Sequence, residues 1–114
     1  MLTGNTLLQV TNYGMGQGDE MLGLQLFENY IKLCLEDNRM PKIVVFYNAG
    51  VKLICEGSPV IEILKKAEDS GVKLMACKTC LNHFGIIDKV AVGIKGTMMD
   101  IITLQDKASK VITL

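Results

Sequence analysis

A short apolar run, a glycine-containing turn and a helical pattern follow one another several times along this chain of 114 residues. This order is typical of β/α units, and the length fits one domain but not two. The expected strands are Thr6–Thr11, Lys42–Tyr47, Val72–Ala76, Lys89–Ile94 and Val111–Leu114. Because strands separated by helices are joined by right-handed crossovers, the sequence predicts a mainly parallel α/β sheet with helices on both faces.

The first helix is expected to begin after the turn Gly14–Gly18, with Asp19 as its N-cap. One set of its apolar residues recurs at the helical period and forms a stripe for the core: Leu24, Phe27, Ile31, Cys34 and Leu35. A second set widens that stripe: Met21, Leu26, Tyr30 and Leu33. The combined surface is wider than one sheet face needs, so we expect part of it to pack against another subunit in a homo-oligomer.

Local signals also place two later helices. Ser58 is expected to cap a helix that has Pro59 at its first position, and Gly71 follows its end, where the left-handed conformation is common. Thr97 and Asp100 have the spacing of a capping box, which indicates that the last helix begins there.

The charge and hydropathy of the chain exclude several classes of protein. Lysine and arginine number 12, and so do aspartate and glutamate, so no net charge attracts nucleic acid or an anionic membrane. The apolar runs are strand length, far short of the roughly 20 residues of a membrane-spanning helix. The N-terminal residues lack the basic region of a secretory signal, so we expect a cytoplasmic location, where thiols stay reduced.

Ligands of parallel α/β sheets gather at the carboxyl ends of the strands. Four loops are expected at that edge: Gly14–Asp19, Asn48–Gly57, Cys77–Gly85 and Lys95–Thr97. In the second of these loops, Asn48 and Gly50 are supporting candidates for a site. The glycines of the first loop are expected to provide a tight turn with positive φ, because their spacing is not the G-x-G-x-x-G of a dinucleotide site. The second expected strand is followed by Asn48 rather than by an acidic residue that would bind a ribose, so no cofactor is expected.

Cys77 and Cys80, in the segment ACKTCLNHFG, are the residues with the clearest chemistry. They follow a strand where a short helix should begin, so backbone N–H groups can favour a thiolate, and Lys78 adds a positive charge. We therefore expect Cys77 to be a reactive thiol at an accessible edge of the sheet, with Cys80 as its partner. A thiolate serves attack on sulfane sulfur, disulfide exchange and metal binding alike, and both cysteines could instead be small buried residues.

The other candidate site residues are less specific. His83 follows Cys80 by three residues and could stabilise its thiolate, or be an ordinary exposed histidine. Cys55 could approach Cys77 as a resolving thiol, whereas Cys34 on the first helix is expected to be inert. Cys77, Cys80 and His83, with Cys55 as a distant fourth, suit zinc chemically. The second half of a typical structural zinc site is missing, so no metal is expected.

Four segments, in order and at matching spacing, resemble the DsrE-like family and, within it, the YedF-type proteins. They are MGQGDEMLG, VVFYNAGVKL, GVKLMACKTCLNHFG and VGIKGTMMDII. The resemblance implies a DsrE-like fold, a three-layer α/β/α sandwich with a five-stranded parallel sheet, and assembly into homo- or hetero-oligomers. It covers only the DsrE-like part of YedF-type proteins, many of which also carry an N-terminal TusA-like domain. The sulfur donor is therefore expected to be a separate protein, such as a TusA-like carrier.

The resemblance also implies a sulfurtransferase-like function, linked in YedF-type proteins to selenium metabolism. In DsrE-like sulfur-relay proteins the working cysteine follows the third strand, and that position corresponds here to Cys77. Cys77 would take a persulfide sulfur from a donor protein and pass it to an acceptor protein, with Cys80 assisting release by forming a disulfide. Two alternatives stay open: a dithiol redox or sensing protein, and a non-enzymatic oligomeric binding module.

Overall fold

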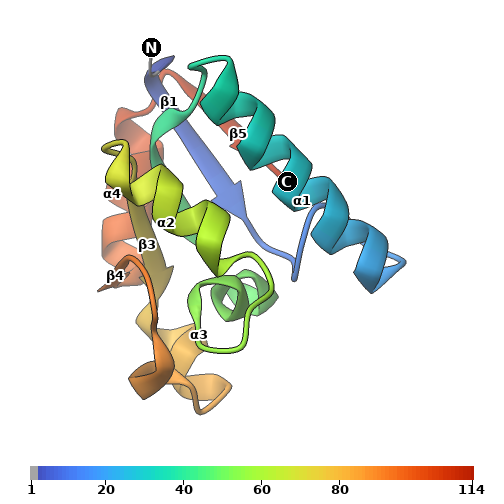
Figure 1. The fold of residues 1–114 in the computed structure, drawn as a ribbon. Coiled ribbons are helices and arrows are strands. Elements are labelled where there is room, and N and C mark those ends of the chain that lie inside the picture. The colour runs from blue at the N-terminus through green and yellow to red at the C-terminus, as the bar shows by residue number, and fades with distance from the viewer. Residues whose placement is uncertain (1–2) are drawn as a thin grey trace.

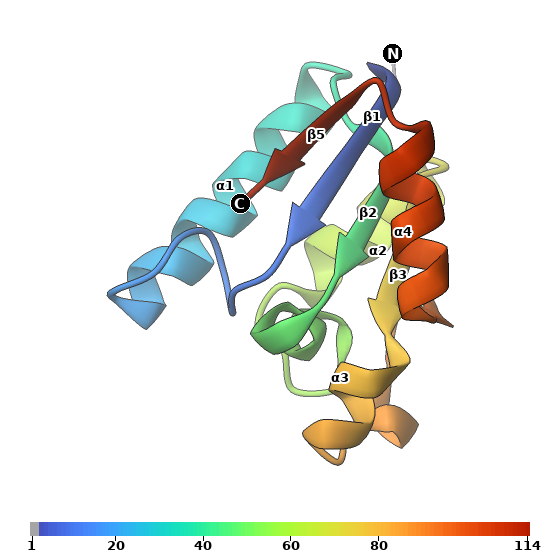
Figure 2. The same ribbon diagram turned by 180° about the vertical axis from the view of Figure 1, so that it is seen from behind.

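The computed structural model describes residues 3–114, which form a five-stranded sheet with helices on both faces (Figures 1 and 2). The strands are β1 (Thr3–Val10), β2 (Pro41–Phe46), β3 (Lys73–Cys77), β4 (Ile94–Gly96) and β5 (Lys110–Thr113). The α-helices are α1 (Glu20–Glu36), α2 (Ile61–Asp69), α3 (Lys78–His83) and α4 (Met98–Lys107). Two further helices, η1 (Asn48–Ile54) and η2 (Ile87–Lys89), are of the 3₁₀ type.

The strands lie in the order β4-β3-β2-β1-β5, and every neighbouring pair is parallel. Helices α1 and α2 pack beside each other on one face of the sheet, and α4 covers the other face (Figures 1 and 2). The predicted α/β/α sandwich is confirmed. At the carboxyl ends of β2 and β3, the chain continues into η1 and α3, which contact each other.

The predicted strand Lys89–Ile94 is wrong, because β4 is only three residues long and starts where that prediction ends. The backbone before β4 pairs with the end of η1 instead of with the sheet. The N–H of Ala91 donates to the carbonyl of Ile54 at 2.8 Å, and Val90 forms an isolated antiparallel bridge with Cys55. These backbone groups are therefore already bonded and cannot extend the sheet.

The predicted caps of α1 and α4 are confirmed. The carboxylate of Asp19 accepts the N–H of Leu22 at 2.8 Å. At the start of α4, the Thr97 hydroxyl accepts the N–H of Asp100 at 3.2 Å, and the Asp100 carboxylate accepts the N–H of Thr97 at 2.8 Å. Both pairs satisfy N–H groups that have no partner inside the helix.

The predicted start of α2 is wrong by two residues. The helix begins at Ile61 with Val60 as its N-cap, and Pro59 lies before it. Ser58 caps a preceding turn instead, since its hydroxyl accepts the N–H of Val60 at 3.3 Å.

The glycine-rich loop before α1 is the tight turn that the sequence predicts, with positive φ at Gly14, Gly16 and Gly18. A side chain at Gly14 would overlap the backbone of Gly23 in the first turns of α1. The N–H of Met15 also donates to the carbonyl of Gly23 at 2.8 Å. This loop therefore packs closely against α1, which accounts for its glycines without a ligand.

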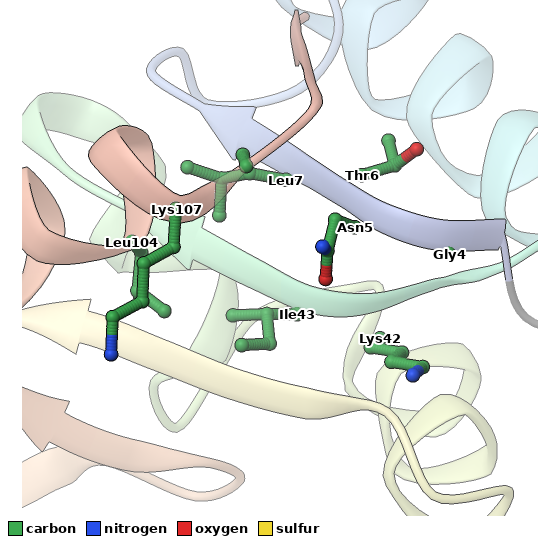
Figure 3. Close-up of a pocket in the computed structure, with 9 residues that line it drawn as sticks. Gly4, Asn5, Thr6, Leu7, Lys42, Ile43, Leu104 and Lys107 are labelled. Carbon is green, nitrogen blue, oxygen red and sulfur yellow. The ribbon is translucent and has the colours of Figure 1, made fainter.

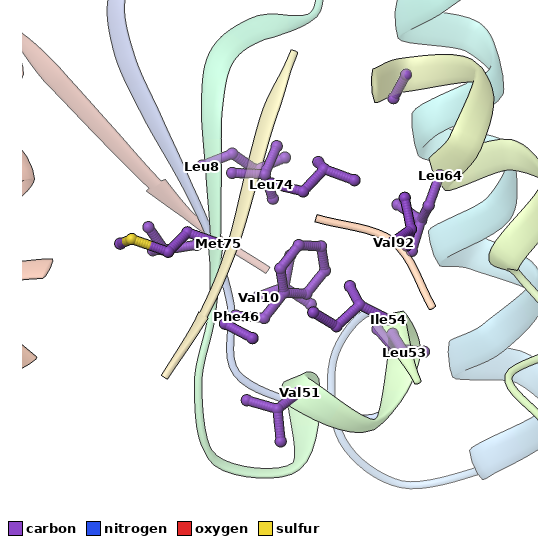
Figure 4. Packing of buried hydrophobic residues seen from close by; sticks show 14 of the residues in the cluster. Leu8, Val10, Phe46, Val51, Leu53, Ile54, Leu64, Leu74, Met75 and Val92 are labelled. Atoms are coloured by element: carbon purple, nitrogen blue, oxygen red, sulfur yellow. The ribbon is translucent and has the colours of Figure 1, made fainter. Parts of the chain in front are cut away.

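The core lies mainly between the sheet and the α1/α2 layer, and it extends to the carboxyl edge (Figure 4). Leu8, Phe46 and Leu74 come from three neighbouring strands and are buried. Residues of η1 are part of the same cluster, because Val51, Leu53 and Ile54 are fully buried. Each such aliphatic side chain stabilises the fold by about 1.5–3 kcal/mol, so η1 is fixed to the sheet as firmly as a core helix.

One side of α1 leaves apolar residues uncovered in the single chain. Met21 is 82% exposed, Leu26 41% and Leu33 60%, whereas Phe27 and Ile31 are fully buried. The sequence-based expectation of more apolar surface than the sheet needs is thus confirmed for this helix. Among residues 3–114, no helix combines the length and the apolar character that crossing a membrane requires.

Candidate functional site

Cys77 is the last residue of β3, and α3 starts at the next residue. Its side chain is only 1% exposed and belongs to the core cluster. The expectation that Cys77 lies at an accessible margin is therefore wrong for the single chain. The physical reason is that β3 is an inner strand whose two faces are both covered, since the successive residues from Leu74 to Cys77 are all buried. Its side chain is therefore enclosed by the packing of a central strand.

Cys80 lies one turn later, on α3, and is half-buried. Its Sγ atom accepts the backbone N–H of Asn48 at 3.1 Å. The thiol of Cys77 lies close enough to raise the pKa of Cys80. Both sulfurs are free thiols. The structure thus brings the two predicted cysteines together, with Cys80 on the solvent side and Cys77 behind it.

The pKa of Cys80 is raised above its ordinary value, mainly because burial disfavours the thiolate. The N–H of Asn48 opposes this shift, since it stabilises a negative sulfur, while the neighbouring Cys77 raises the pKa of Cys80 further. The thiol of Cys80 is therefore protonated at neutral pH. The N–H group that favours a thiolate comes from η1, not from the start of α3 as the sequence had indicated.

Asn48 begins η1 with a φ of 53°, which is unusual for a residue other than glycine. Its contact with the site is made by the backbone, a role that its residue type alone could not reveal. Gly50 lies further along η1 and supports the site indirectly. A side chain there would overlap the carbonyl of Val10 at the end of β1, so glycine lets η1 pack against that strand.

Lys78 and His83 both lie on the surface. Lys78 is exposed, and its charge contributes to lowering the pKa of Asp100, after the larger effect of the hydrogen bonds from Thr97. His83 is also exposed, and its ring packs edge-on against Phe84 with 5.2 Å between the ring centroids.

Cys55 is buried at the end of η1, where its thiol donates to the carbonyl of Val51 at 3.4 Å. A weaker contact of 4.0 Å links the same sulfur to the carbonyl of Ile86. Burial raises the pKa of Cys55, and the charge of Glu56 adds to the effect. These contacts hold Cys55 as a neutral, inward-facing thiol, and its suggested role as a resolving thiol stays a prediction.

Cys34 is half-buried on α1, and burial raises the pKa of its thiol as well. This agrees with the expectation of an inert cysteine. Within residues 3–114, no three histidine, cysteine or acidic side chains are grouped so that they could hold a metal ion.

A small pocket of about 160 Å³ lies at the opposite end of the sheet from the thiols (Figure 3). Its lining comes mainly from the starts of β1 and β2 and from the end of α4: Gly4, Asn5, Thr6, Leu7, Lys42, Ile43, Leu104, Lys107 and Ala108. Ligands of parallel sheets gather at the other edge, so this pocket is not part of the candidate site.

A family model described as the DsrE/DsrF-like family matches residues 7–114. The chain belongs to this family. The match covers the strand and the α3 segment that carry Cys77 and Cys80. No curated protein shows a significant match to the chain.

Three solved structures share the fold of this chain over nearly its whole length. The protein of unknown function MTH1491 from Methanobacterium thermoautotrophicum superposes with a TM-score of 0.72 at 18% identity, covering 96% of this chain and 97% of that one. The ychN protein from E. coli superposes with a TM-score of 0.72 at 20% identity, covering 96% of this chain and 98% of that one. The conserved protein of unknown function BT1422 from Bacteroides thetaiotaomicron superposes with a TM-score of 0.72 at 14% identity, covering 96% of this chain and 95% of that one. At these identities the likeness establishes the fold alone.

Proposed function

We propose that this chain is a sulfur-relay protein that carries a persulfide on the Cys77–Cys80 pair. The observation that carries the proposal is a half-exposed thiol, Cys80, held against a second, buried thiol at the carboxyl edge of the sheet. Membership of the DsrE/DsrF-like family supports it. The resemblance to YedF-type proteins supports a finer assignment to that group, with selenium as a second element that the same thiol could carry.

The burial of Cys77 changes the roles that the sequence suggested. Another protein can reach Cys80 without moving β3, whereas Cys77 is 1% exposed. Cys80 therefore takes the sulfur first. Its thiol loses a proton to solvent, and the thiolate attacks the outer sulfur of a donor persulfide. The donor S–S bond breaks, the donor leaves as a thiolate, and Cys80 holds a persulfide without any net oxidation.

Release follows the same chemistry in reverse. A thiolate of the acceptor protein attacks the outer sulfur on Cys80, and Cys80 leaves as a thiolate. Cys77 offers a second outcome, in which it attacks Sγ of Cys80, forms the Cys77–Cys80 disulfide and expels hydrosulfide. That disulfide must then be reduced by an external thiol before the next cycle. We propose a TusA-like carrier as the donor, within the cytoplasm.

Persulfide mass spectrometry tests this proposal. The reduced protein is incubated with a cysteine desulfurase and cysteine, and the sulfur is located by peptide mapping. We expect one added sulfur on Cys80, its loss in Cys80→Ala and its retention in Cys34→Ala, the matched control. An adduct that persists in Cys80→Ala, or no adduct on the wild type, would contradict the proposal.

The proximity of the two thiols favours one alternative, a dithiol redox or sensing protein. That function requires a stable and reversible Cys77–Cys80 disulfide near the cellular redox potential. A redox titration with glutathione measures whether this disulfide forms in that range, and sulfur loading then separates the two functions, because only a sulfur carrier also gains sulfur on Cys80.

A homo-oligomer is also part of the proposal. The uncovered apolar side chains on α1, among them Met21 and Leu33, would be buried by a second copy of the chain.

A further inference from the structure

The contact between Asn48 and Cys80 joins two elements that are 32 residues apart in the sequence. The donor is the first N–H of η1, and the acceptor is the sulfur on which the proposed relay depends. We propose that the peptide N–H of Asn48 is a further catalytic group, which stabilises the negative charge on Sγ of Cys80 both as attacking thiolate and as leaving thiolate. This inference rests on the proposed function for its purpose, but its physical content concerns Cys80 alone.

The N–H group is held in place before any sulfur arrives. Asn48 adopts a left-handed φ of 53°, and the preceding N–H, of Tyr47, donates to the carbonyl of Val10 at 3.1 Å. Beyond Asn48, Gly50 packs against that same carbonyl, and Val51 is fully buried. The backbone on both sides of Asn48 is therefore anchored to the end of β1. A donor fixed in this way does not need to reorganise when charge develops on the sulfur.

The chemistry gives this donor two uses. A hydrogen bond to a charged sulfur is stronger than one to a neutral thiol, so the N–H increases the fraction of Cys80 that is thiolate. Lowering a thiol pKa by one unit gives about ten times more thiolate but reduces its nucleophilicity about threefold, so capture of sulfur gains about threefold. In the release step, the S–S bond breaks with both electrons on Sγ, and the same N–H stabilises that leaving thiolate.

A purely structural reading exists, in which the sulfur is only an acceptor for an N–H that lacks one. The two readings differ in what a displaced N–H changes. The structural reading predicts a loss of stability alone, whereas the proposal also predicts a shift in the titration of Cys80.

The test uses two substitutions of Asn48. A valine rarely adopts positive φ and will rotate the peptide away from Cys80, whereas a glycine adopts it freely and keeps the N–H. The alkylation rate of Cys80 is followed from neutral to alkaline pH by mass spectrometry. We expect Asn48→Val to raise the midpoint of the Cys80 titration by about one pH unit and to slow sulfur loading at neutral pH about threefold. Asn48→Gly should keep both at their wild-type values.

Asn38 provides a matched control, because it also has a left-handed φ, of 56°, and lies just after α1 rather than on η1 or α3. Asn38→Val should lower the thermal midpoint without moving the titration of Cys80. An Asn48→Val variant that loses stability but keeps the wild-type titration midpoint would overturn the proposal. A shifted midpoint in a protein that never accepts sulfur would support the contact and refute the sulfur-relay function.

A second measurement does not depend on the folding of a variant. In the wild-type protein, the amide proton resonance of Asn48 should move downfield as Cys80 ionises, with the same midpoint as the alkylation profile. The movement should be absent in Cys80→Ser. An amide resonance that does not titrate with Cys80 would overturn the proposal.

Discussion

Gly50 lies directly against the carbonyl group of Val10, with no room between them for a side chain. The N–H of Tyr47 donates to the same carbonyl oxygen at 3.1 Å. The end of β1 thereby fixes the start of η1, and with it the N–H group that contacts Cys80. The geometry of the thiol pair thus depends on a strand that carries no residue of the site.

Replacing Gly50 tests this dependence. Gly50→Ala forces a Cβ atom into the backbone of Val10, so we expect the free energy of unfolding to fall by about 1–3 kcal/mol in urea denaturation. Gly4→Ala is the control, because a Cβ atom there meets nothing within 4 Å. Equal stability of the two variants would show that η1 can shift without cost.

The burial difference between the thiols predicts an order of modification. Cys80 is half-buried and Cys77 is sealed in the core, so a small alkylating reagent should label Cys80 at least about tenfold faster in the native protein. In denaturant the two rates should become similar. Faster native labelling of Cys77 would mean that the carboxyl edge of the sheet opens in solution. Cys77 would then be the thiol that first accepts sulfur.

The pH dependence of Cys80 reactivity follows from its raised pKa. Burial is the main cause and Cys77 adds to it, so the midpoint of the labelling rate should lie at higher pH than the midpoint of an ordinary thiol, which is about 8.5. Removing the second thiol in Cys77→Ala should move the midpoint to lower pH. An upward movement would show that Cys77 stabilises the Cys80 thiolate rather than opposing it.

The buried thiols also predict how stability changes in alkaline solution. Burial raises the folded-state pKa of Cys34 and Cys55, so above the ordinary thiol pKa the unfolded chain releases protons that the folded chain retains. The stabilising contribution of these thiols is fully present below the pKa of the unfolded chain. The free energy of unfolding should therefore decrease as pH rises from that value through the higher folded-state pKa. The double variant Cys34→Ala/Cys55→Ala should show a shallower decrease in urea titrations, and an unchanged slope would contradict this origin.

The apolar side of α1 predicts the effect of a charge on assembly. Leu33 is 60% exposed, and Leu33→Glu should reduce the mass measured by light scattering to that of a single chain while leaving stability unchanged. Lys65→Glu on the exposed side of α2 is the control. A wild-type protein that is already a monomer, or a Leu33→Glu variant that stays assembled, would exclude this surface as the interface.

Elements that depend on near neighbours in the sequence were determined by the sequence itself. Asp19 reaches Leu22, and Thr97 reaches Asp100, each over three residues, so the residue types fix these helix starts whatever the rest of the chain does. The order of strands and helices likewise follows from local periodicity. The spacing of Cys77 and Cys80 placed both thiols on one turn for the same reason.

The tertiary structure decided every feature that needed a distant partner. The segment before β4 does not form the predicted strand, because its backbone groups bond to the end of η1. Cys77 is buried because both faces of β3 are covered, and Cys80 is the more exposed member of the pair. The bond from Asn48 to Cys80 spans 32 residues, and such a contact exists only after β2 and β3 lie side by side. Local residue types fix local geometry, but which atoms meet across the fold is set by the packing of the whole sheet.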